Sequence, residues 1–152
     1  MPGTAGSHAS GVETMNTPAQ NIADLAGRLL LATMFLLAGL QKIGGYAGTQ
    51  AYMDAAGVPG ALLPLVIALE VGGALAIIAG WHTRLVALLL AGFTIVAAFL
   101  FHRVPGDALQ AILFMKNLAI AGGFLLLVAR GAGDWSLDAR RSALTAPATV
   151  GA

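Results

Sequence analysis

Long apolar stretches separated by short polar segments set the pattern of this sequence. Four of them approach the length of about 20 residues, at 1.5 Å rise each, that a helix needs to cross the hydrocarbon core of a bilayer. Open strands would leave backbone groups unpaired in lipid, so each stretch is predicted to be a helix. The four predicted spans are residues 25–44, 61–80, 84–102 and 108–130.

The connections between the spans predict how the helices are arranged. Residues 81–83 and 103–107 join the last three spans, and links this short force neighbouring helices to run antiparallel. The longer link, residues 45–60, is predicted to form a short interfacial helix that ends at Gly57 and Pro59. The predicted fold class is an all-α membrane protein, a four-transmembrane-helix antiparallel bundle with a short interfacial helix between the first two spans.

Small and polar residues occupy both ends of the chain. The first 24 residues hold no apolar run of the kind found in a cleavable signal peptide, so the first span is expected to act as an uncleaved anchor. Met15 is an alternative candidate for the start. We expect a disordered N-terminal tail over residues 1–20, a transmembrane domain over residues 21–139 and a flexible C-terminal tail over residues 140–152.

A helix start is recognisable just before the first span. Thr17 is a suitable N-cap residue, Pro18 suits the first helical position, and Gln20 stands three residues after the cap. A threonine and a glutamine at this spacing can satisfy two backbone N–H groups reciprocally, which is the capping box. The pattern therefore predicts that a helix begins at Pro18.

Composition agrees with a protein whose solvent is lipid. Only 10% of the 152 residues are charged and 58% are hydrophobic, whereas soluble domains are about 25% charged. The net charge of +1 gives no electrostatic basis for binding nucleic acid. Cysteine is absent, which excludes disulfides, thiolate metal sites and iron–sulfur clusters within the chain. Any redox chemistry would need a cofactor or a partner protein.

The placement of arginine and lysine predicts the orientation of the bundle. With both termini in the cytoplasm, five basic residues lie on the cytoplasmic side and three on the other side, as the positive-inside rule expects. The chain is therefore predicted to be a multi-pass protein of the bacterial cytoplasmic (inner) membrane, N-in and C-in. The cytoplasmic residues are Arg28, Arg84, Arg130, Arg140 and Arg141, and the others are Lys42, Arg103 and Lys116.

Polar residues at membrane depth are the main functional signal. Each ionisable one costs about 2.5–3.5 kcal/mol at the centre of an inserted helix, so each needs a partner or a role. In the predicted topology Glu70 lies about 13 Å below the outer surface and Lys116 about 10–12 Å. All four spans contribute polar groups to the outer half of the bundle. The catalytic candidates are Glu70, Lys116 and His102, and the substrate-binding candidates are Lys42, Gln41, Asn117 and Arg28.

Two interpretations of this cluster stay open. Glu70 and Lys116, if both face inward, could form a structural ion pair that fixes helix register, with desolvation offsetting most of the attraction. The cluster could instead form a polar pocket for a quinone head group, a proton or a small polar substrate. Arg28 is expected to snorkel to lipid phosphates, and His102 to lie at the interface. His82 and His102 stand at opposite ends of one predicted helix, about 30 Å apart, so they cannot share a haem; no metal site is predicted.

A stripe of small residues four apart runs along the second span. Such spacing lets two helix backbones approach closely. We expect the stripe to pack within the bundle, with a homodimer face as the alternative. Elsewhere the sequence holds no phosphate-binding loop or catalytic motif of a self-sufficient enzyme. The stripe consists of Ala68, Gly72, Ala76 and Gly80.

Several short motifs occur along the chain in a fixed order. The motifs are Arg28-Leu29, Gly39-Leu40-Gln41-Lys42-Ile43, Gly57-Val58-Pro59, Leu69-Glu70-Val71-Gly72-Gly73, Gly80 with Thr83-Arg84, Phe101-His102, Lys116-Asn117, and Gly131-Ala132-Gly133-Asp134 with Trp135-Ser136-Leu137-Asp138. Together they resemble the DoxX-like (DoxX/DoxD) family of small four-helix bacterial membrane proteins. The resemblance covers about residues 22–139, and the order and spacing of the motifs make it specific. One departure is Ala132, where many members have proline.

The resemblance implies a function linked to redox chemistry. Some relatives are subunits of thiosulfate–quinone oxidoreductases, and others are linked to membrane-associated redox or oxidative-stress complexes. The implied function is a quinone-associated membrane subunit or anchor of an oxidoreductase complex, without a covalently bound cofactor and not an enzyme by itself. The alternatives are a small transport or permeability component and a structural assembly factor. The family's recurring polar positions correspond to Arg28, Lys42, Glu70, His102 and Asn117.

Within the redox hypothesis the polar residues take separate roles. Glu70 would accept a proton, and Lys116 and Lys42 would stabilise negative charge that develops on a quinone oxygen. His102 would relay protons to the surface. The partners expected are the lipid bilayer and a soluble or membrane oxidoreductase, with a homo-oligomer as a further option and no nucleic acid.

Overall fold

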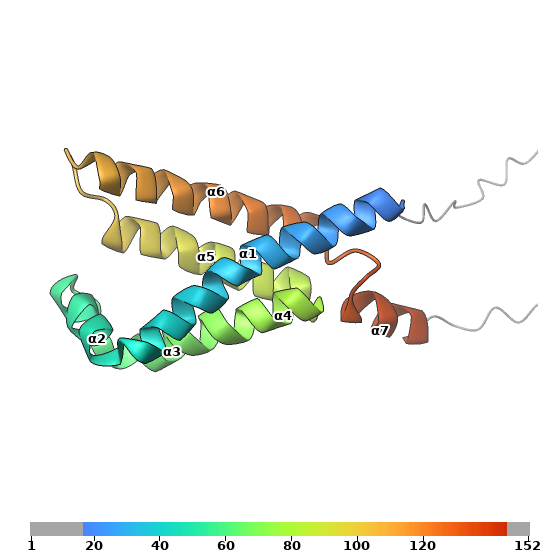
Figure 1. Cartoon of the computed structure of the whole chain (residues 1–152), viewed down its shortest axis with the longest axis horizontal. Helices are drawn as coiled ribbons and strands as arrows, with labels where there is room; N and C mark the ends of the chain where they lie inside the picture. Colours follow the sequence, from blue (N-terminus) through green and yellow to red (C-terminus); the bar gives the residue numbers. More distant parts are fainter. Residues whose placement is uncertain (1–16, 146–152) are drawn as a thin grey trace, which may run out of the picture.

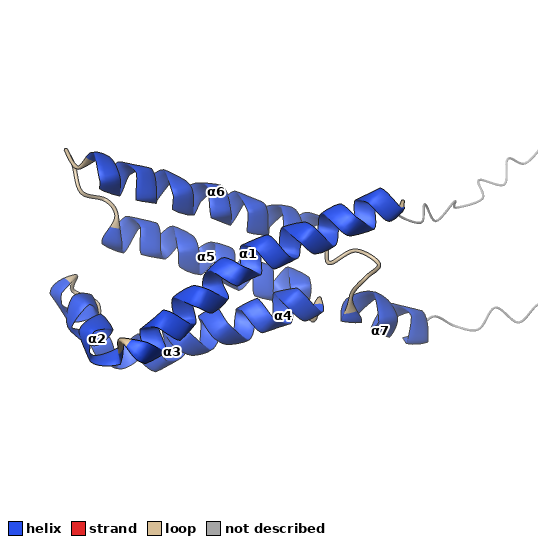
Figure 2. Cartoon of the chain, viewed as in Figure 1, coloured by secondary structure: helices blue, strands red, loops and turns tan. Residues whose placement is uncertain are grey.

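The computed structural model describes residues 17–145, which fold into a bundle of long helices (Figure 1). In this part of the chain four helical segments are long and apolar enough to cross a membrane. Figure 2 shows that the regular elements described are all helices, so the predicted fold class is confirmed. The four segments are α1 (Pro18–Gly44), a composite helix (Gly60–Ala79), α5 (Thr83–Phe101) and α6 (Ala108–Arg130).

The ends of the folded region differ from the predicted boundaries. Helix α1 begins at Pro18, and the capping box between Thr17 and Gln20 is present, as predicted. At the other end α7 (Leu137–Thr145) continues as a helix through residues 140–145, which were assigned to a flexible tail. Helix α1 likewise includes residues 18–20 of the predicted N-terminal tail, and residues 1–16 and 146–152 lie outside the described residues.

The second span is assembled from four short helical pieces. These are η1 (Gly60–Leu62), α3 (Leu63–Ile67), η2 (Ala68–Gly72) and α4 (Gly73–Ala79), and η2 is a π-helical turn. A π turn holds an extra residue and so rotates the residues that follow it. The predicted stripe of small residues is split for this reason: Ala76 and Gly80 are buried, whereas Ala68 and Gly72 are exposed.

The predicted interfacial helix is present as α2 (Tyr46–Ala55). It ends as predicted at Gly57, whose φ of +78° suits glycine. The N–H of Val58 donates to the carbonyl of Met53 at 2.9 Å. The carboxylate of Asp54 then accepts from the N–H of Gly60 at 2.7 Å, which fastens α2 to the start of the second span.

Alanine-rich packing joins the helices at the centre of the bundle. Helix α1 packs along α4 and η2, and α5 packs along α6. The core includes Ala32, Ala87 and Ala91, and the rings of Phe35 and Phe124 meet edge to face at 5.3 Å. Only 22–33% of the most apolar window of each span is buried, so most apolar side chains point outward. Lipid is the solvent that such a surface requires.

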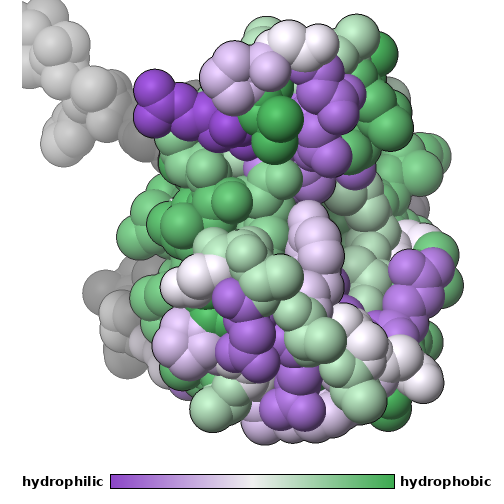
Figure 3. Space-filling view, turned by 90° about the vertical axis from the view of Figure 1, so that its left-hand side faces the viewer, coloured by the Kyte–Doolittle hydropathy of each residue, from purple (hydrophilic) through white to green (hydrophobic). Residues whose placement is uncertain are grey.

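The two ends of the bundle carry different elements. The described chain begins and ends at one end, where α7 lies, while α2 and the α5–α6 loop lie at the other end (Figure 1). Figure 3 looks onto the α2 end and shows hydrophilic residues gathered across it, with hydrophobic residues on the flanks. We call these the α7 end and the α2 end.

Candidate functional site

A cavity of about 440 Å³ lies at the α2 end of the bundle. It is bounded by α1 and the second span on one side and by α5 and α6 on the other, with α2 contributing Thr49, Tyr52 and Met53. Its lining is mostly apolar, and hydrophobic residues at its rim are partly exposed. The rim therefore faces the lipid. The partly exposed apolar residues are Met34, Leu62, Val96 and Leu100.

An ion pair forms the polar part of one cavity wall. The ammonium Nζ of Lys42 lies 2.9 Å from Oε1 of Glu70, and the two side chains are 26% and 5% exposed. The second carboxylate oxygen, Oε2 of Glu70, is buried and has no hydrogen-bond partner among the described residues. The carboxylate therefore keeps the capacity to accept a hydrogen bond from a ligand.

The partner of Glu70 differs from the predicted one. Lys116 is exposed on α6 and does not line the cavity. Its neighbour Asn117 takes the inward position instead, because successive residues on a helix point about 100° apart. Lys42 reaches Glu70 from the last turn of α1, so the predicted pairing of Glu70 with Lys116 was wrong.

Local backbone geometry places Glu70 inside the bundle. Glu70 is the central residue of the π turn η2, and such turns are often found at functional sites. On the facing helix, Gly39 allows a close approach, because a Cβ there would lie 2.6 Å from the side chain of Val71 and 3.3 Å from Cβ of Glu70. A glycine in α1 and a wide turn in the second span thus bring the carboxylate to the cavity.

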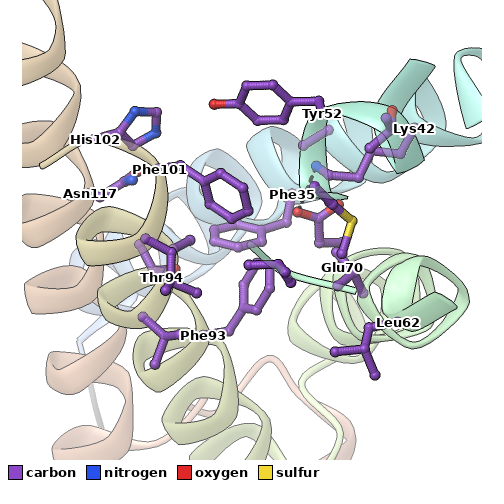
Figure 4. A pocket seen from close by; sticks show the side chains of 18 of the residues that line it. Phe35, Lys42, Tyr52, Leu62, Glu70, Phe93, Thr94, Phe101, His102 and Asn117 are labelled. Carbon is purple, nitrogen blue, oxygen red and sulfur yellow. Dashed lines mark hydrogen bonds and ion pairs between the residues drawn. The ribbon is translucent and has the colours of Figure 1, made fainter. Parts of the chain in front are cut away.

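A second polar group lies on the opposite wall. Figure 4 shows His102 and Asn117 across the cavity from Lys42 and Glu70. Nδ1 of His102 lies 2.8 Å from Oε1 of Gln110. An amide oxygen only accepts, so Nδ1 donates in this contact. Asn117 is 8% exposed and lines the cavity.

Aromatic rings separate the two polar walls. Tyr52 of α2 stacks on Phe101 of α5 with ring centroids 5.4 Å apart and planes 22° apart. Phe35 and Phe93 point into the space between the polar groups (Figure 4). The cavity thus has aromatic surfaces between polar groups on two facing walls.

Comparison with known proteins gives the chain its family. The sequence profile of the DoxX family matches residues 23–103. This chain belongs to the DoxX family. It is 53% identical over 119 residues to the inner membrane protein YqjF of Escherichia coli (strain K12), which is 78% of this chain and 92% of that relative. It is 38% identical over 123 residues to the inner membrane protein YphA of the same organism, covering 76% and 88% of the two chains. No solved structure matches it.

Arg28 occupies a different place in this DoxX protein from the one expected. It is completely buried, and its Nη2 donates to the carbonyl of Trp135 at 2.6 Å. The prediction that Arg28 snorkels to lipid phosphates is therefore wrong. The residue lies at the α7 end, under a segment of residues 131–138 that we call the C-terminal clasp, and it does not line the cavity. Its role is to hold the clasp onto α1.

Asp138 fixes the far side of the clasp. Its two carboxylate oxygens accept from the backbone N–H groups of His82 and Thr83, each at 2.8 Å, at the start of α5. Burial raises the pKa of Asp138, but the hydrogen bonds from Thr83 and His82 outweigh this effect and the pKa is lowered overall. A residue 55 positions away from Thr83 thus caps α5.

The cavity unites some of the sequence-predicted residues and leaves others out. It is lined by Glu70, Lys42, His102 and Asn117. Gln41, Lys116 and Arg28 lie elsewhere. Sequence reasoning missed the aromatic lining and Gln110. A polar Gln110 just inside the fourth span, opposite the residue that ends the third, was the available signal for its contact with His102.

Proposed function

We propose that this chain is a quinone-binding membrane subunit of an oxidoreductase complex, with the quinone head group in the cavity at the α2 end. The observation that carries the proposal is a pair of polar groups on opposite walls, separated by aromatic rings. A quinone has the matching chemistry: a flat ring with carbonyl oxygens on opposite sides. Pockets for such ligands are mostly apolar with a few placed polar groups.

The side chains suit the two ends of the head group. On one wall the Lys42 ammonium donates a hydrogen bond to a carbonyl oxygen and stabilises the negative charge that develops there on reduction. Glu70, within 2.9 Å of Lys42, delivers or takes up the proton. On the other wall Asn117 donates to the second oxygen, and His102 passes protons toward the surface. Electrons come from a partner oxidoreductase.

The apolar rim of the cavity supports the proposal that the ligand arrives from the membrane. Met34, Leu62, Val96 and Leu100 are 39–55% exposed and line the cavity. A lipophilic molecule dissolved in the bilayer would meet an apolar rim before the charged pair. A polar solute would have to cross it against its own desolvation cost. This contrast favours the quinone over transport of a small polar solute.

The names of the relatives indicate which membrane holds the chain, and the placement of arginines indicates its orientation. We place the chain in the inner membrane, the location that the names of its relatives give. The α7 end carries Arg84, Arg130, Arg140 and Arg141, and both described termini lie there. The positive-inside rule puts this end in the cytoplasm. The cavity then opens near the outer side of the bilayer.

Photolabelling tests the proposal directly. The purified full chain in lipid nanodiscs is exposed to a photoreactive short-chain ubiquinone, and labelled residues are mapped by mass spectrometry. We expect labels on cavity residues of α1, α2 and α5, competed away by unlabelled ubiquinone. Glu70→Gln should reduce specific labelling about tenfold, as the loss of a charge-assisted contact would. Labels spread evenly over the lipid-exposed faces would refute the proposal.

A matched pair of lysines provides the control. Lys42→Gln removes a cavity ammonium, and Lys116→Gln removes an ammonium that is exposed on α6 outside the cavity. Only the first should lower labelling. Equal labelling of the Lys42 variant and the unmodified protein would assign the ion pair a purely structural role. Purification from native membranes in mild detergent, followed by identification of copurifying proteins and quinones, then tests for the partner oxidoreductase.

A further inference from the structure

The α7 end holds a second concavity that the proposed function does not use. It has a volume of about 670 Å³ and lies among the α4–α5 turn, the end of α6, the clasp and α7. Three arginines line it: Arg84, Arg130 and Arg141. We call it the basic groove.

The negative charges in the groove are already engaged. Both oxygens of Asp138 accept backbone N–H groups at the start of α5. Oδ2 of Asp134 accepts from the amide of Asn21 at 3.3 Å. By contrast, Arg84 and Arg130 are exposed and form no ion pair with any residue between 17 and 145. The groove therefore presents two guanidinium groups that can bind an added anion.

Arg84 and Arg130 lie at two helix ends that border the groove. Arg84 lies in the first turn of α5, next to the N-terminus that the carboxylate of Asp138 caps. Its guanidinium lies over Gly131, where a Cβ would be 3.5 Å from Nε. This brings Arg84 beside the C-terminal turn of α6, which contains Arg130. Both arginines line the groove, so an anionic ligand there can contact both.

Two tryptophans place the groove at the level of lipid headgroups. Trp81 lies in the α4–α5 turn and Trp135 lies in the clasp, and they are 49% and 52% exposed. Tryptophan concentrates at the boundary between hydrocarbon and water. An anion at this depth is a lipid phosphate, and basic pockets between helices on the cytoplasmic side are suited to such headgroups.

We propose that the basic groove binds the phosphate group of an anionic phospholipid, with Arg84 and Arg130 as its main contacts. Arginine suits this ligand because its planar fork donates two parallel hydrogen bonds to phosphate oxygens. The clasp completes the site by holding α7, whose Arg141 lies 3.0 Å from Nε2 of His82 at the groove's edge. The proposal stands independently of quinone binding, because the two sites lie at opposite ends of the bundle.

Native mass spectrometry of the full chain tests the proposal. The protein in detergent is titrated with phosphatidylglycerol or with phosphatidylcholine of the same acyl chains. We expect tighter binding of phosphatidylglycerol. Each basic residue at an anionic lipid surface contributes about fivefold in affinity, so Arg84→Gln with Arg130→Gln should weaken phosphatidylglycerol binding roughly 25-fold. Arg103→Gln, which removes an exposed arginine at the other end of the bundle, should leave it unchanged.

A lysine variant and a competition experiment distinguish the effects of charge, of folding and of the source of the phosphate. The Arg84→Lys and Arg130→Lys double variant keeps both charges and should retain the preference for phosphatidylglycerol, which also covers the case of a poorly folded glutamine variant. Millimolar inorganic phosphate should not displace the lipid. Equal affinity for the two lipids, an equal loss in Arg103→Gln, or displacement by inorganic phosphate would overturn the proposal.

Discussion

At the α2 end of the bundle, Lys42 and Glu70 meet beside a cavity of about 440 Å³, whereas at the α7 end Arg28 is enclosed by the C-terminal clasp. Both ends hold charge at or near membrane depth, where it is expensive. At the α7 end the carbonyl of Trp135 accepts from Nη2 of Arg28; Nε and Nη1 have no hydrogen-bond partner among residues 17–145, and Arg28 lines neither cavity. At the α2 end one carboxylate oxygen is left without a partner among residues 17–145.

From this difference we expect separate roles for the two charges: Arg28 serves helix packing, and Glu70 serves the proposed binding site. A charge that is enclosed and lines no cavity fixes how segments pack, and changing it should alter stability. A charge at the wall of a cavity keeps some capacity for a ligand, and changing it should alter binding as well. The inward positions of Glu70 and Arg28 look alike in the sequence, since each is one ionisable residue within an apolar stretch. Only their surroundings distinguish them.

The largest expected effect comes from closing the space around Arg28. Gly80 has φ of +66°, and a Cβ there would collide with Nη1 of Arg28 and with Ser136. Gly80→Ala should lower the free energy of unfolding by about 3 kcal/mol, from left-handed strain and overpacking together. Thermal unfolding in detergent measures the change. Gly92→Ala is the control, because nothing lies within 4 Å of its Cβ position in α5; it should be neutral or slightly stabilising.

The ion pair should show an asymmetric response. Lys42→Met strands a carboxylate that is 5% exposed, whereas Glu70→Gln strands an ammonium that is 26% exposed and can reach water. Lys42→Met should therefore cost about 2 kcal/mol of stability and Glu70→Gln about 1 kcal/mol, both below the range for fully buried pairs. The double variant should recover most of the loss. Additive losses in the double variant would show that the two side chains do not act as a pair.

Hydropathy was sufficient to predict the architecture because lipid leaves few choices. Each span had to be a helix of about 20 residues, and the short links had to make neighbours antiparallel. The helix start at Thr17 and the end of α2 at Gly57 were predictable from local capping chemistry. These features depend on residues close together in the sequence.

The site was only partly predictable because its geometry depends on helix rotation. The polar residues of the α2 end were found from membrane cost, yet whether Lys42 or Lys116 reaches Glu70 depends on rotations that hydropathy does not specify. The π turn at Ala68–Gly72 adds a rotation that no residue pattern announced. The clasp was missed for another reason: Arg28 and Trp135 are 107 positions apart, and their contact leaves no local signal.

Acid should selectively weaken the α7 end. Asp138 has a lowered pKa in the folded protein, so its stabilising contribution is present above the ordinary carboxyl pKa of about 3.9 and is lost as pH falls through the lowered value. Asp138→Asn leaves one acceptor for two N–H groups and should cost about 1 kcal/mol at neutral pH. The unfolding temperatures of the variant and the unmodified protein should converge in acid. Asp107→Asn, at the N-cap of α6, should change little at neutral pH, since asparagine caps equally well.

The smallest effect should separate binding from stability at a single residue. Asn117 lines the cavity, is 8% exposed, and its side-chain amide has no hydrogen-bond partner among residues 17–145. If its amide serves a quinone oxygen, Asn117→Leu removes one hydrogen bond from the complex and none from the free protein. Quinone affinity should then fall about fivefold, the equivalent of one hydrogen bond of about 1 kcal/mol, while the unfolding temperature stays constant or rises. A lower unfolding temperature with unchanged affinity would show that Asn117 stabilises the fold and does not bind the quinone. His102 would then be left as the polar residue that binds the quinone on that wall of the cavity.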